Sequence, residues 1–235
     1  MYISKAVLNP QRRGAKRLLS SPQRMHAAVL ASFAPGGESE SAAGRILWRL
    51  DPGAHHVDLL VVSPRLPDLI GIVEEAGWPL TTPAQSKPYD QFLDRVCVGS
   101  QWHYRLRANP VHAIKKDGWD RSRRVGHVSA EHQAQWWIDR AAKVGLQLLE
   151  PPMPLVEPVR AADRVAVSER ATLIFERHTD NGESARGRRV TISSAVFEGH
   201  AEVTDAALVR PALTHGVGRA RAYGCGLLTL VAPRP

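Results

Sequence analysis

The order of apolar patterns in the first third of the chain constrains its fold more than any other feature. Alternating apolar residues indicate strands, and apolar residues at three- and four-residue spacing indicate helices. These patterns predict a strand at 2–8, a helix at 21–33, strands at 45–50 and 56–62, and a helix at 69–77. With room for a short last strand before residue 94, this is the order of a ferredoxin-like domain, in which two helices cover one face of an antiparallel sheet.

The helix at 21–33 has the clearest start. Ser21 stands at a suitable N-cap position, and Pro22 stands at the first helical position, where a missing N–H costs nothing. Met25 recurs with later apolar residues at helical spacing, so that face should be buried. We interpret the preceding segment, 9–20, which begins with Asn-Pro, as a loop.

The rest of the chain repeats this order with less regular spacing. Its patterns predict a strand at 100–111, a helix at 129–145, strands at 146–150, 170–178 and 188–203, a helix at 204–216 and a strand at 226–231. A second ferredoxin-like half with an inserted hairpin accounts for the extra strand. We therefore predict an α+β protein of two tandem ferredoxin-like domains with antiparallel sheets, residues 1–94 and 95–235. Segment 113–124 is interpreted as a basic loop, and the pair Trp136 and Trp137 as half core and half surface.

The chain of 235 residues has a formal net charge of +8, and its bases are clustered. The first 24 residues hold six bases and no acid, and residues 113–124 hold five bases and two acids. Such clusters favour a polyanionic partner, because each phosphate contact releases a counterion; a solvated basic face is the alternative. No apolar run approaches the roughly 18 residues of a membrane span. The basic N-terminal stretch does not resemble an export signal and the two cysteines suit a reducing compartment, so we expect a cytoplasmic protein with no membrane partner.

The segment 214–231, THGVGRARAYGCGLLTLV, is rich in glycine. It is not a dinucleotide-binding fingerprint, because Arg221 stands where the third glycine would be, and it lacks the Gly-Lys-Ser/Thr end of a P-loop. Its backbone can still approach a ligand closely, with Arg219 and Arg221 beside it. We expect a phosphate-binding or backbone-packing role, with a plain turn as the alternative, and Tyr223 either stacks on a base or packs. The glycines are Gly216, Gly218, Gly224 and Gly226.

His26 is the best single candidate for acid–base chemistry. The chain has ten histidines, so a purely structural role for any one of them is the alternative. It follows the inward-facing Met25, so its ring should lie at the edge of the buried face. The nearby cations Lys16, Arg17 and Arg24 should lower its pKa. We find no paired acids in the sequence that suggest a two-metal nuclease, so we expect phosphodiester chemistry without a metal and no cofactor.

Six segments together resemble one family. They are KAVLNP (5–10), SPQRMHAAV (21–29), ILWRLDP (46–52), YRLRANPV (104–111), AVFEGHAEV (195–203) and GVGRARAYGCGLLTL (216–230). Similar segments occur in the same order in CRISPR-associated endoribonucleases of the CasE type, in the RAMP superfamily. These are the repeat-processing subunits of the Cascade complex, and the resemblance spans nearly the whole chain.

The resemblance implies two RRM-like domains, the hairpin of CRISPR repeat RNA as partner, and contacts with other Cascade subunits. It implies metal-independent cleavage of precursor CRISPR RNA by 2′-hydroxyl attack and retention of the mature guide. The P-x-x-M-H spacing places the family's histidine at His26, and the glycine-rich loop maps onto 216–226. A basic hairpin that enters the RNA stem maps onto roughly 176–198. The expected RNA-binding cations are Arg13, Lys16, Arg17, Arg24, Lys115, Lys116, Arg123, Arg124, Arg186, Arg188, Arg189, Arg219 and Arg221.

Two positions depart from the family pattern. Some members carry tyrosine three residues before the histidine and arginine just after it, whereas this chain has Gln23 and Ala27. Gln23 can orient a phosphate or the histidine by hydrogen bonds, so it is the second catalytic candidate, but it cannot donate a proton as a phenol does. A non-catalytic CRISPR-RNA-binding subunit is therefore the alternative function. A general RNA chaperone fits the charge and fold but not the glycine-rich loop.

Overall fold

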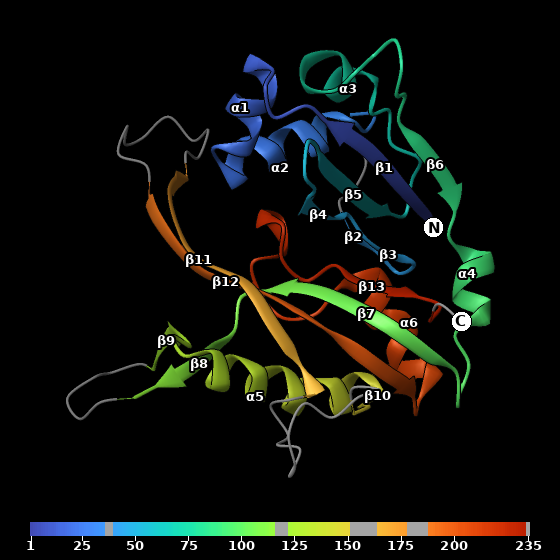
Figure 1. The fold of residues 1–235 in the computed structure, drawn as a ribbon, viewed down its shortest axis with the longest axis vertical. Helices are drawn as coiled ribbons and strands as arrows, with labels where there is room; N and C mark the ends of the chain where they lie inside the picture. Colours follow the sequence, from blue (N-terminus) through green and yellow to red (C-terminus); the bar gives the residue numbers. More distant parts are fainter. Residues whose placement is uncertain (36–39, 116–121, 151–163, 178–187, 234–235) are drawn as a thin grey trace.

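The computed structural model describes residues 1–35, 40–115, 122–150, 164–177 and 188–233. They form two main antiparallel sheets that lie face to face between outer layers of helices (Figure 1). The predicted fold, two ferredoxin-like domains with antiparallel sheets, is confirmed. We keep 1–94 and 95–235 as the proposed limits of the two domains.

The first sheet has the strand order β4-β5-β1-β6, and its paired strands are antiparallel. Its strands are β1 (Tyr2–Leu8), β4 (Leu47–Pro52), β5 (Val57–Ser63) and β6 (Gln85–Pro88). The first strand lies in the middle, as the ferredoxin-like connection requires. Alternation along β1 places Ala6 and Leu8 in the core beneath the helices, whereas Ile3 packs toward the second half.

Two helices follow β1 where one was predicted. The helices of this half are α1 (Arg13–Leu19), α2 (Pro22–Ala31), α3 (Ile70–Ala76) and α4 (Asp90–Arg95), and β2 (Glu40–Ser41) and β3 (Gly44–Arg45) pair before β4. The prediction of a loop at 9–20 was therefore wrong. Only Ala15 and Leu18 of α1 are buried, too few positions for periodicity to reveal a helix. Gly14 lets α1 approach α3, since a Cβ there would lie 2.3 Å from the carbonyl oxygen of Glu75.

The second sheet has the order β10-β12-β7-β13, which repeats the order of the first, and β11 adds beside β12. Its elements are β7 (Gln101–Ala108), α5 (Ala130–Ala141), β10 (Leu146–Leu148), β11 (Ala166–Arg177), β12 (Arg188–Val203), α6 (Ala206–His215) and β13 (Leu228–Val231). β12 pairs with β7 and β10 toward its C-terminal end and with β11 along the rest. β11 and β12 are thus the predicted inserted hairpin. The basic segment 113–124 is not a loop at its ends, because β8 (Val111–Ile114) pairs with β9 (Arg123–Gly126).

α5 starts at a capped position and carries two buried indoles. The N-cap Ser129 accepts from the backbone N–H of His132, and Gly145 ends the helical segment with a φ of 79°. Trp136 and Trp137 are 7% and 0% exposed, so the prediction that one faces solvent was wrong. Gly218 of the glycine-rich loop lies against Trp136, which explains why this indole is buried.

The helix-free faces of the two sheets meet through charged side chains. Arg49 of β4 is 2% exposed and donates to the carbonyl oxygens of Arg105 at 2.9 Å and Leu227 at 3.0 Å. It also donates to the hydroxyl of Thr229 at 3.0 Å. Asp51 accepts from both Arg49 and Arg105. These bonds fix the halves relative to one another, so a loop of the second half can complete a site on the first.

Candidate functional site

His26 lies on α2 with its ring half-buried. Its Nδ1 accepts a hydrogen bond from the indole Nε1 of Trp48 on β4, at 3.4 Å. Trp48 is 2% exposed, so the donor is fixed in the core. Because Nδ1 is the acceptor, the neutral ring carries its hydrogen on Nε2.

The surroundings of His26 lower its pKa below the ordinary value of 6.5. Burial is the larger cause, because a low dielectric disfavours the imidazolium, and the guanidinium of Arg45 is the second. The predicted direction is confirmed, but the predicted cause was wrong. Lys16, Arg17 and Arg24 lie exposed on α1 and α2, and the charge that acts on His26 comes from β3. The ring is therefore mainly neutral at neutral pH.

The glycine-rich loop, residues 216–226, comes from the second half and packs against α2 and β4. It runs from α6 through a short 3-10 turn, η3 (Arg221–Tyr223), to β13. Gly224 has a φ of 76°, and a Cβ there would lie 2.7 Å from Cζ3 of Trp48. Glycine is therefore required where the loop meets the indole that bonds His26. Gly216, Gly218 and Gly226 have φ values of 79°, 79° and 91°.

The turn η3 brings an aromatic ring to His26. The ring centroids of Tyr223 and His26 lie 6.3 Å apart in an edge-to-face arrangement. Tyr223 also meets Phe175 of β11 at 4.8 Å, again edge to face. Tyr223 is thus held between α2 and the inserted hairpin, with a phenol close to the histidine.

Four arginines line a pocket of about 550 Å³ over the glycine-rich loop, together with the loop backbone. Arg45 comes from β3, Arg140 from α5, and Arg219 and Arg221 from the loop; we call this the arginine pocket. Burial, and then the charge of Arg45, lower the pKa of Arg221, whereas Glu40, which pairs with Arg45 at 3.1 Å, opposes this effect. The guanidinium of Arg140 stacks over the Trp136 ring at 4.7 Å. Fixed guanidinium groups of this kind suit phosphate oxygens.

An apolar groove of about 540 Å³ lies on another side of the site, between the α1–α2 junction and β11. Met25, Trp48 and Tyr223 form its end near His26, and Leu18 and Leu173 line its walls. A nucleobase is a flat, largely apolar group that stacks on aromatic side chains. The arrangement can therefore hold a phosphate in the arginine pocket and a base in the apolar groove.

Gln23 lies in the first turn of α2, three residues before His26, and is half-buried. Residues at this spacing share one helix face. The structure thus places the second catalytic candidate next to His26 along the helix.

The expected RNA-binding cations lie in four separate places, and two of them, Arg219 and Arg221, line the arginine pocket. The described cations elsewhere are all exposed: Arg13, Lys16, Arg17 and Arg24 on α1 and α2, Lys115, Arg123 and Arg124 at the β8–β9 hairpin, and Arg189 on β12. Arg17 pairs with Glu75 at 2.7 Å. Lys116 and Arg186 lie outside the described residues, and Arg188 is described only by its backbone in β12.

Three residues of the site were not predicted. Trp48 and His26 are 22 positions apart, and no spacing in the sequence signals their contact. Arg45 likewise reaches the site only through the fold. Arg140 had a signal, because it follows Trp136 by four residues in a predicted helix, which is the spacing that stacks a cation on an aromatic ring.

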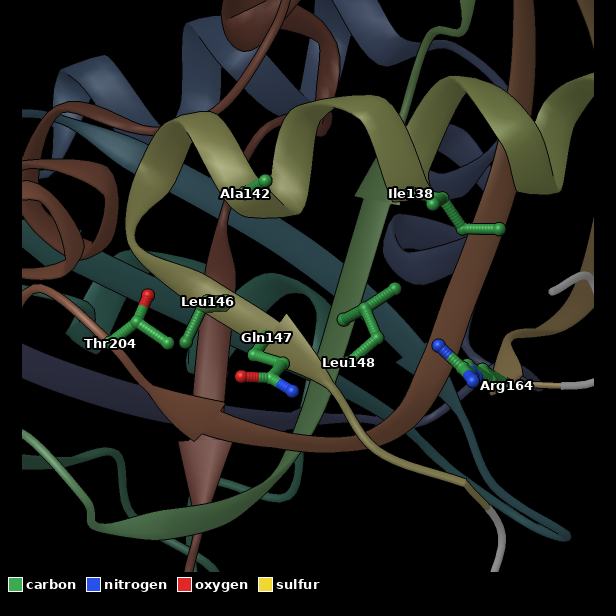
Figure 2. A pocket seen from close by; sticks show the side chains of 7 residues that line it. All are labelled: Ile138, Ala142, Leu146, Gln147, Leu148, Arg164 and Thr204. Carbon is green, nitrogen blue, oxygen red and sulfur yellow. The ribbon is translucent and has the colours of Figure 1, made fainter.

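A separate pocket of about 350 Å³ opens between α5 and β10 (Figure 2). Ile138, Leu146 and Leu148 give it an aliphatic lining, and Arg164 lies at one end. Arg164 donates to Glu150 at 2.9 Å. The lining has no histidine or carboxylate among the described residues, so this pocket lacks the groups for proton transfer that surround His26.

Within the described ranges, no three His, Cys, Asp or Glu side chains converge as metal ligands do. In the same part of the chain, no helix is long and apolar enough to cross a membrane.

Comparisons with known proteins find similarity to CRISPR-associated proteins along nearly the whole chain. The family model described as "CRISPR associated protein" matches residues 1–233. The CRISPR-associated endoribonuclease Cse3 of Thermus thermophilus is 31% identical over 234 residues, which are 99% of this chain and 100% of the relative. A solved structure of CRISPR endoribonuclease Cse3 bound to a 19-nucleotide RNA has a TM-score of 0.73 at 28% identity, covering 98% of this chain and 100% of that one. A chain of a CRISPR RNA-guided surveillance complex has a TM-score of 0.61 at 25% identity, covering 99% of this chain and 100% of its own.

Proposed function

The chain belongs to the CRISPR-associated protein family and is of the CasE type, and from this premise we propose that it is an endoribonuclease that binds the hairpin of CRISPR repeat RNA and cleaves precursor CRISPR RNA in the cytoplasm. One observation carries the proposal at this chain's own residues. His26, with a lowered pKa, contacts Trp48 and Tyr223 of an apolar groove that suits a base, and it lies within the field of Arg45 of an arginine pocket that suits a phosphate. Each nucleotide of an RNA strand has a phosphate for the arginine pocket and a base for the apolar groove.

The reaction is attack of the ribose 2′-hydroxyl on the adjacent phosphorus. The 2′-O–P bond forms, the P–O5′ bond breaks, and the products are a 2′,3′-cyclic phosphate and a 5′-hydroxyl. One proton leaves the 2′-oxygen and one reaches the 5′-oxygen, so a residue that moves protons is sufficient and no metal is needed. His26 is that residue, and a positioned acid or base contributes about 10²- to 10⁴-fold to the rate.

The arginine pocket stabilises charge on the phosphorane. Arg219 and Arg221 flank the loop backbone, and Arg45 lies close enough to act on the pKa of both His26 and Arg221. Guanidinium groups held before the substrate arrives need no reorganisation as negative charge develops. This group of cations therefore acts in the transition state as well as in binding.

Tyr223 provides a phenol near His26 in a chain that lacks the tyrosine some family members carry three residues before the histidine. Its ring lies 6.3 Å from that of His26, whereas the position three residues earlier holds Gln23. Gln23 orients a phosphate oxygen, and Tyr223 positions the substrate base and the histidine ring. Tyr223→Phe keeps the ring and removes only the hydroxyl, so it separates stacking from hydrogen bonding by the phenol.

The inserted β11–β12 hairpin binds the RNA stem. A two-stranded ribbon is thin enough for the deep groove of A-form RNA, and Arg189 is exposed on β12. The exposed cations on α1 and α2 and at the β8–β9 hairpin add phosphate contacts. The product stays bound, and the protein with its guide RNA joins the other Cascade subunits, as the likeness to a surveillance-complex chain supports.

A denaturing gel tests the proposal. Cognate repeat RNA is incubated with the protein in excess EDTA, beside a matched RNA with a 2′-deoxy group at the scissile nucleotide. Cleavage of the all-ribose strand alone is expected. Tight binding with no cut in either strand would instead support the non-catalytic RNA-binding subunit, and cleavage of the deoxy strand would contradict 2′-hydroxyl attack.

A further inference from the structure

Three histidine rings form a column beside the arginine pocket. His112 on β8 lies 4.4 Å from His127, which follows β9, and His127 lies 6.0 Å from His132 on α5, between ring centroids. These rings line a pocket of about 350 Å³ between the β8–β9 hairpin and α5, and we call it the histidine pocket. Figure 1 shows the hairpin lying against the first turns of α5.

The charged groups around the histidine pocket favour an anion. Arg140 of α5 and Lys143, in the turn after α5, line it, and the one carboxylate in the lining, Asp139, already accepts from Gln135 at 2.7 Å. The three rings do not converge as metal ligands do, in keeping with the rest of the described residues. A pocket with two cations, imidazoles and an occupied carboxylate suits a phosphate.

Buried polar atoms without a partner also mark this region. The indole Nε1 of Trp136 and the guanidinium Nε of Arg140 are buried and have no hydrogen-bond partner among the described residues, and both residues line the histidine pocket. Buried N–H groups normally find an acceptor, so donors left in this state beside a cavity point to one that arrives from outside. A phosphate oxygen supplies such an acceptor.

Arg140 connects the histidine pocket to the site described above. It lines both the histidine pocket and the arginine pocket, and its guanidinium lies over the Trp136 ring between them. Gly218 of the glycine-rich loop lies on the same indole, since a Cβ there would be 3.3 Å from its Cη2. A chain that leaves the arginine pocket over Arg140 therefore enters the histidine pocket next.

We propose that the histidine pocket is a second phosphate site, which binds the backbone of the repeat RNA next to the segment held in the arginine pocket. The inference rests on the proposed function, because it needs an RNA strand in the arginine pocket. In the free protein, a charge on one imidazole disfavours protonation of the neighbouring imidazoles. The negative charge of a bound phosphate favours their protonation. Burial and the neighbouring His112 and His132 lower the pKa of His127 in the free protein, and a bound phosphate reverses the effect of those neighbours.

Binding is therefore linked to proton uptake at the histidine pocket. The charged groups that line the pocket with the rings are Asp139 and Arg140 of α5 and Lys143, in the turn after that helix. A histidine that takes up a proton on binding makes the Kd lower at pH 6 than at pH 8, by at most about tenfold per pH unit.

The first test uses repeat RNA with the 2′-deoxy group, which cannot be cut. Its Kd is measured at pH 6 and pH 8 for the wild-type protein, for the double variant His127→Gln, His132→Gln, and for the control His55→Gln in an exposed turn of the other half. His26 is present in all three proteins, so it contributes equally. We expect the pH dependence to flatten in the double variant alone. An unchanged pH dependence in the double variant overturns the proposal.

The second test removes a fixed charge. Lys143→Met should make the plot of log K against log salt shallower by about 0.7 to 0.9 for one lost phosphate contact. Lys87→Met, at an exposed lysine on β6, should leave the slope unchanged. Normal cleavage with an unchanged slope in Lys143→Met contradicts the histidine pocket and leaves the proposed function intact. Failure of the wild-type protein to bind or cut repeat RNA overturns both.

Discussion

Replacement of Gly224 by alanine tests whether the glycine-rich loop positions His26 through Trp48. Gly224 has a φ of 76°, and the new Cβ would lie 2.7 Å from Cζ3 and 3.0 Å from Cη2 of the Trp48 ring. These are atoms of an indole that is 2% exposed, so the ring cannot swing into solvent to make room. The loop or the indole has to move.

The expected magnitude has two parts. A left-handed conformation costs an alanine about 1–2 kcal/mol, and we expect at least this loss in the free energy of unfolding. Displacement of Trp48 also removes its hydrogen bond to His26, and a bond of this kind is worth about 0.5–1.5 kcal/mol. If the whole energy of this bond serves to hold His26 in its catalytic position, the cleavage rate falls about 2- to 13-fold, because about 1.4 kcal/mol corresponds to a tenfold change in rate.

Urea denaturation and single-turnover cleavage of repeat RNA measure the two parts. Gly71→Ala is the matched control, because Gly71 lies in α3 with nothing within 4 Å of its Cβ position. Alanine favours a helix by up to about 1 kcal/mol, so this control should be equally or more stable and fully active. A Gly224→Ala protein with wild-type stability and wild-type cleavage would refute the link between the loop, Trp48 and His26.

Three further predictions follow from buried groups. Because the folded-state pKa of His26 lies below 6.5, the free energy of unfolding should fall as pH drops through and below that value, and His26→Asn should flatten this part of the urea-denaturation profile. Arg49→Met should destabilise the protein by about 3–5 kcal/mol in the same assay, because it leaves buried acceptors unpaired; a loss below about 1 kcal/mol would contradict the role of this side chain between the sheets. Burial raises the pKa of Cys225 to about 12, so iodoacetamide at pH 8 should modify the exposed Cys97 and not Cys225 in the folded protein, as peptide mass mapping would show.

The sheets could be predicted because each strand has its own apolar pattern. β12 was predicted with its observed limits, 188–203, and the repeated order of strands and helices was sufficient to give the tandem fold. α1 could not be predicted, because the helix is short and only two of its residues are buried; its packing depends on Gly14 meeting α3. Tertiary contact decided its conformation, and local periodicity did not.

The candidate site was predictable only in part, for a related reason. His26 and the glycine-rich loop could be selected from residue type and family resemblance, and the direction of the pKa shift followed from basic surroundings. The contributors to that shift could not be found, since burial and Arg45 on β3 act through the fold. The arginine pocket joins β3, α5 and the loop, which are far apart in the chain. No spacing rule within one segment connects such residues.

Single-turnover cleavage by His26→Ala tests the central claim most directly. The variant and the wild-type protein are compared in excess EDTA on cognate repeat RNA, and the Kd of each is measured on the 2′-deoxy RNA. We predict a cleavage rate lower by about 10²-fold or more, with a Kd that stays close to the wild-type value. Cleavage by the variant at the wild-type rate would remove His26 from the mechanism and contradict the account.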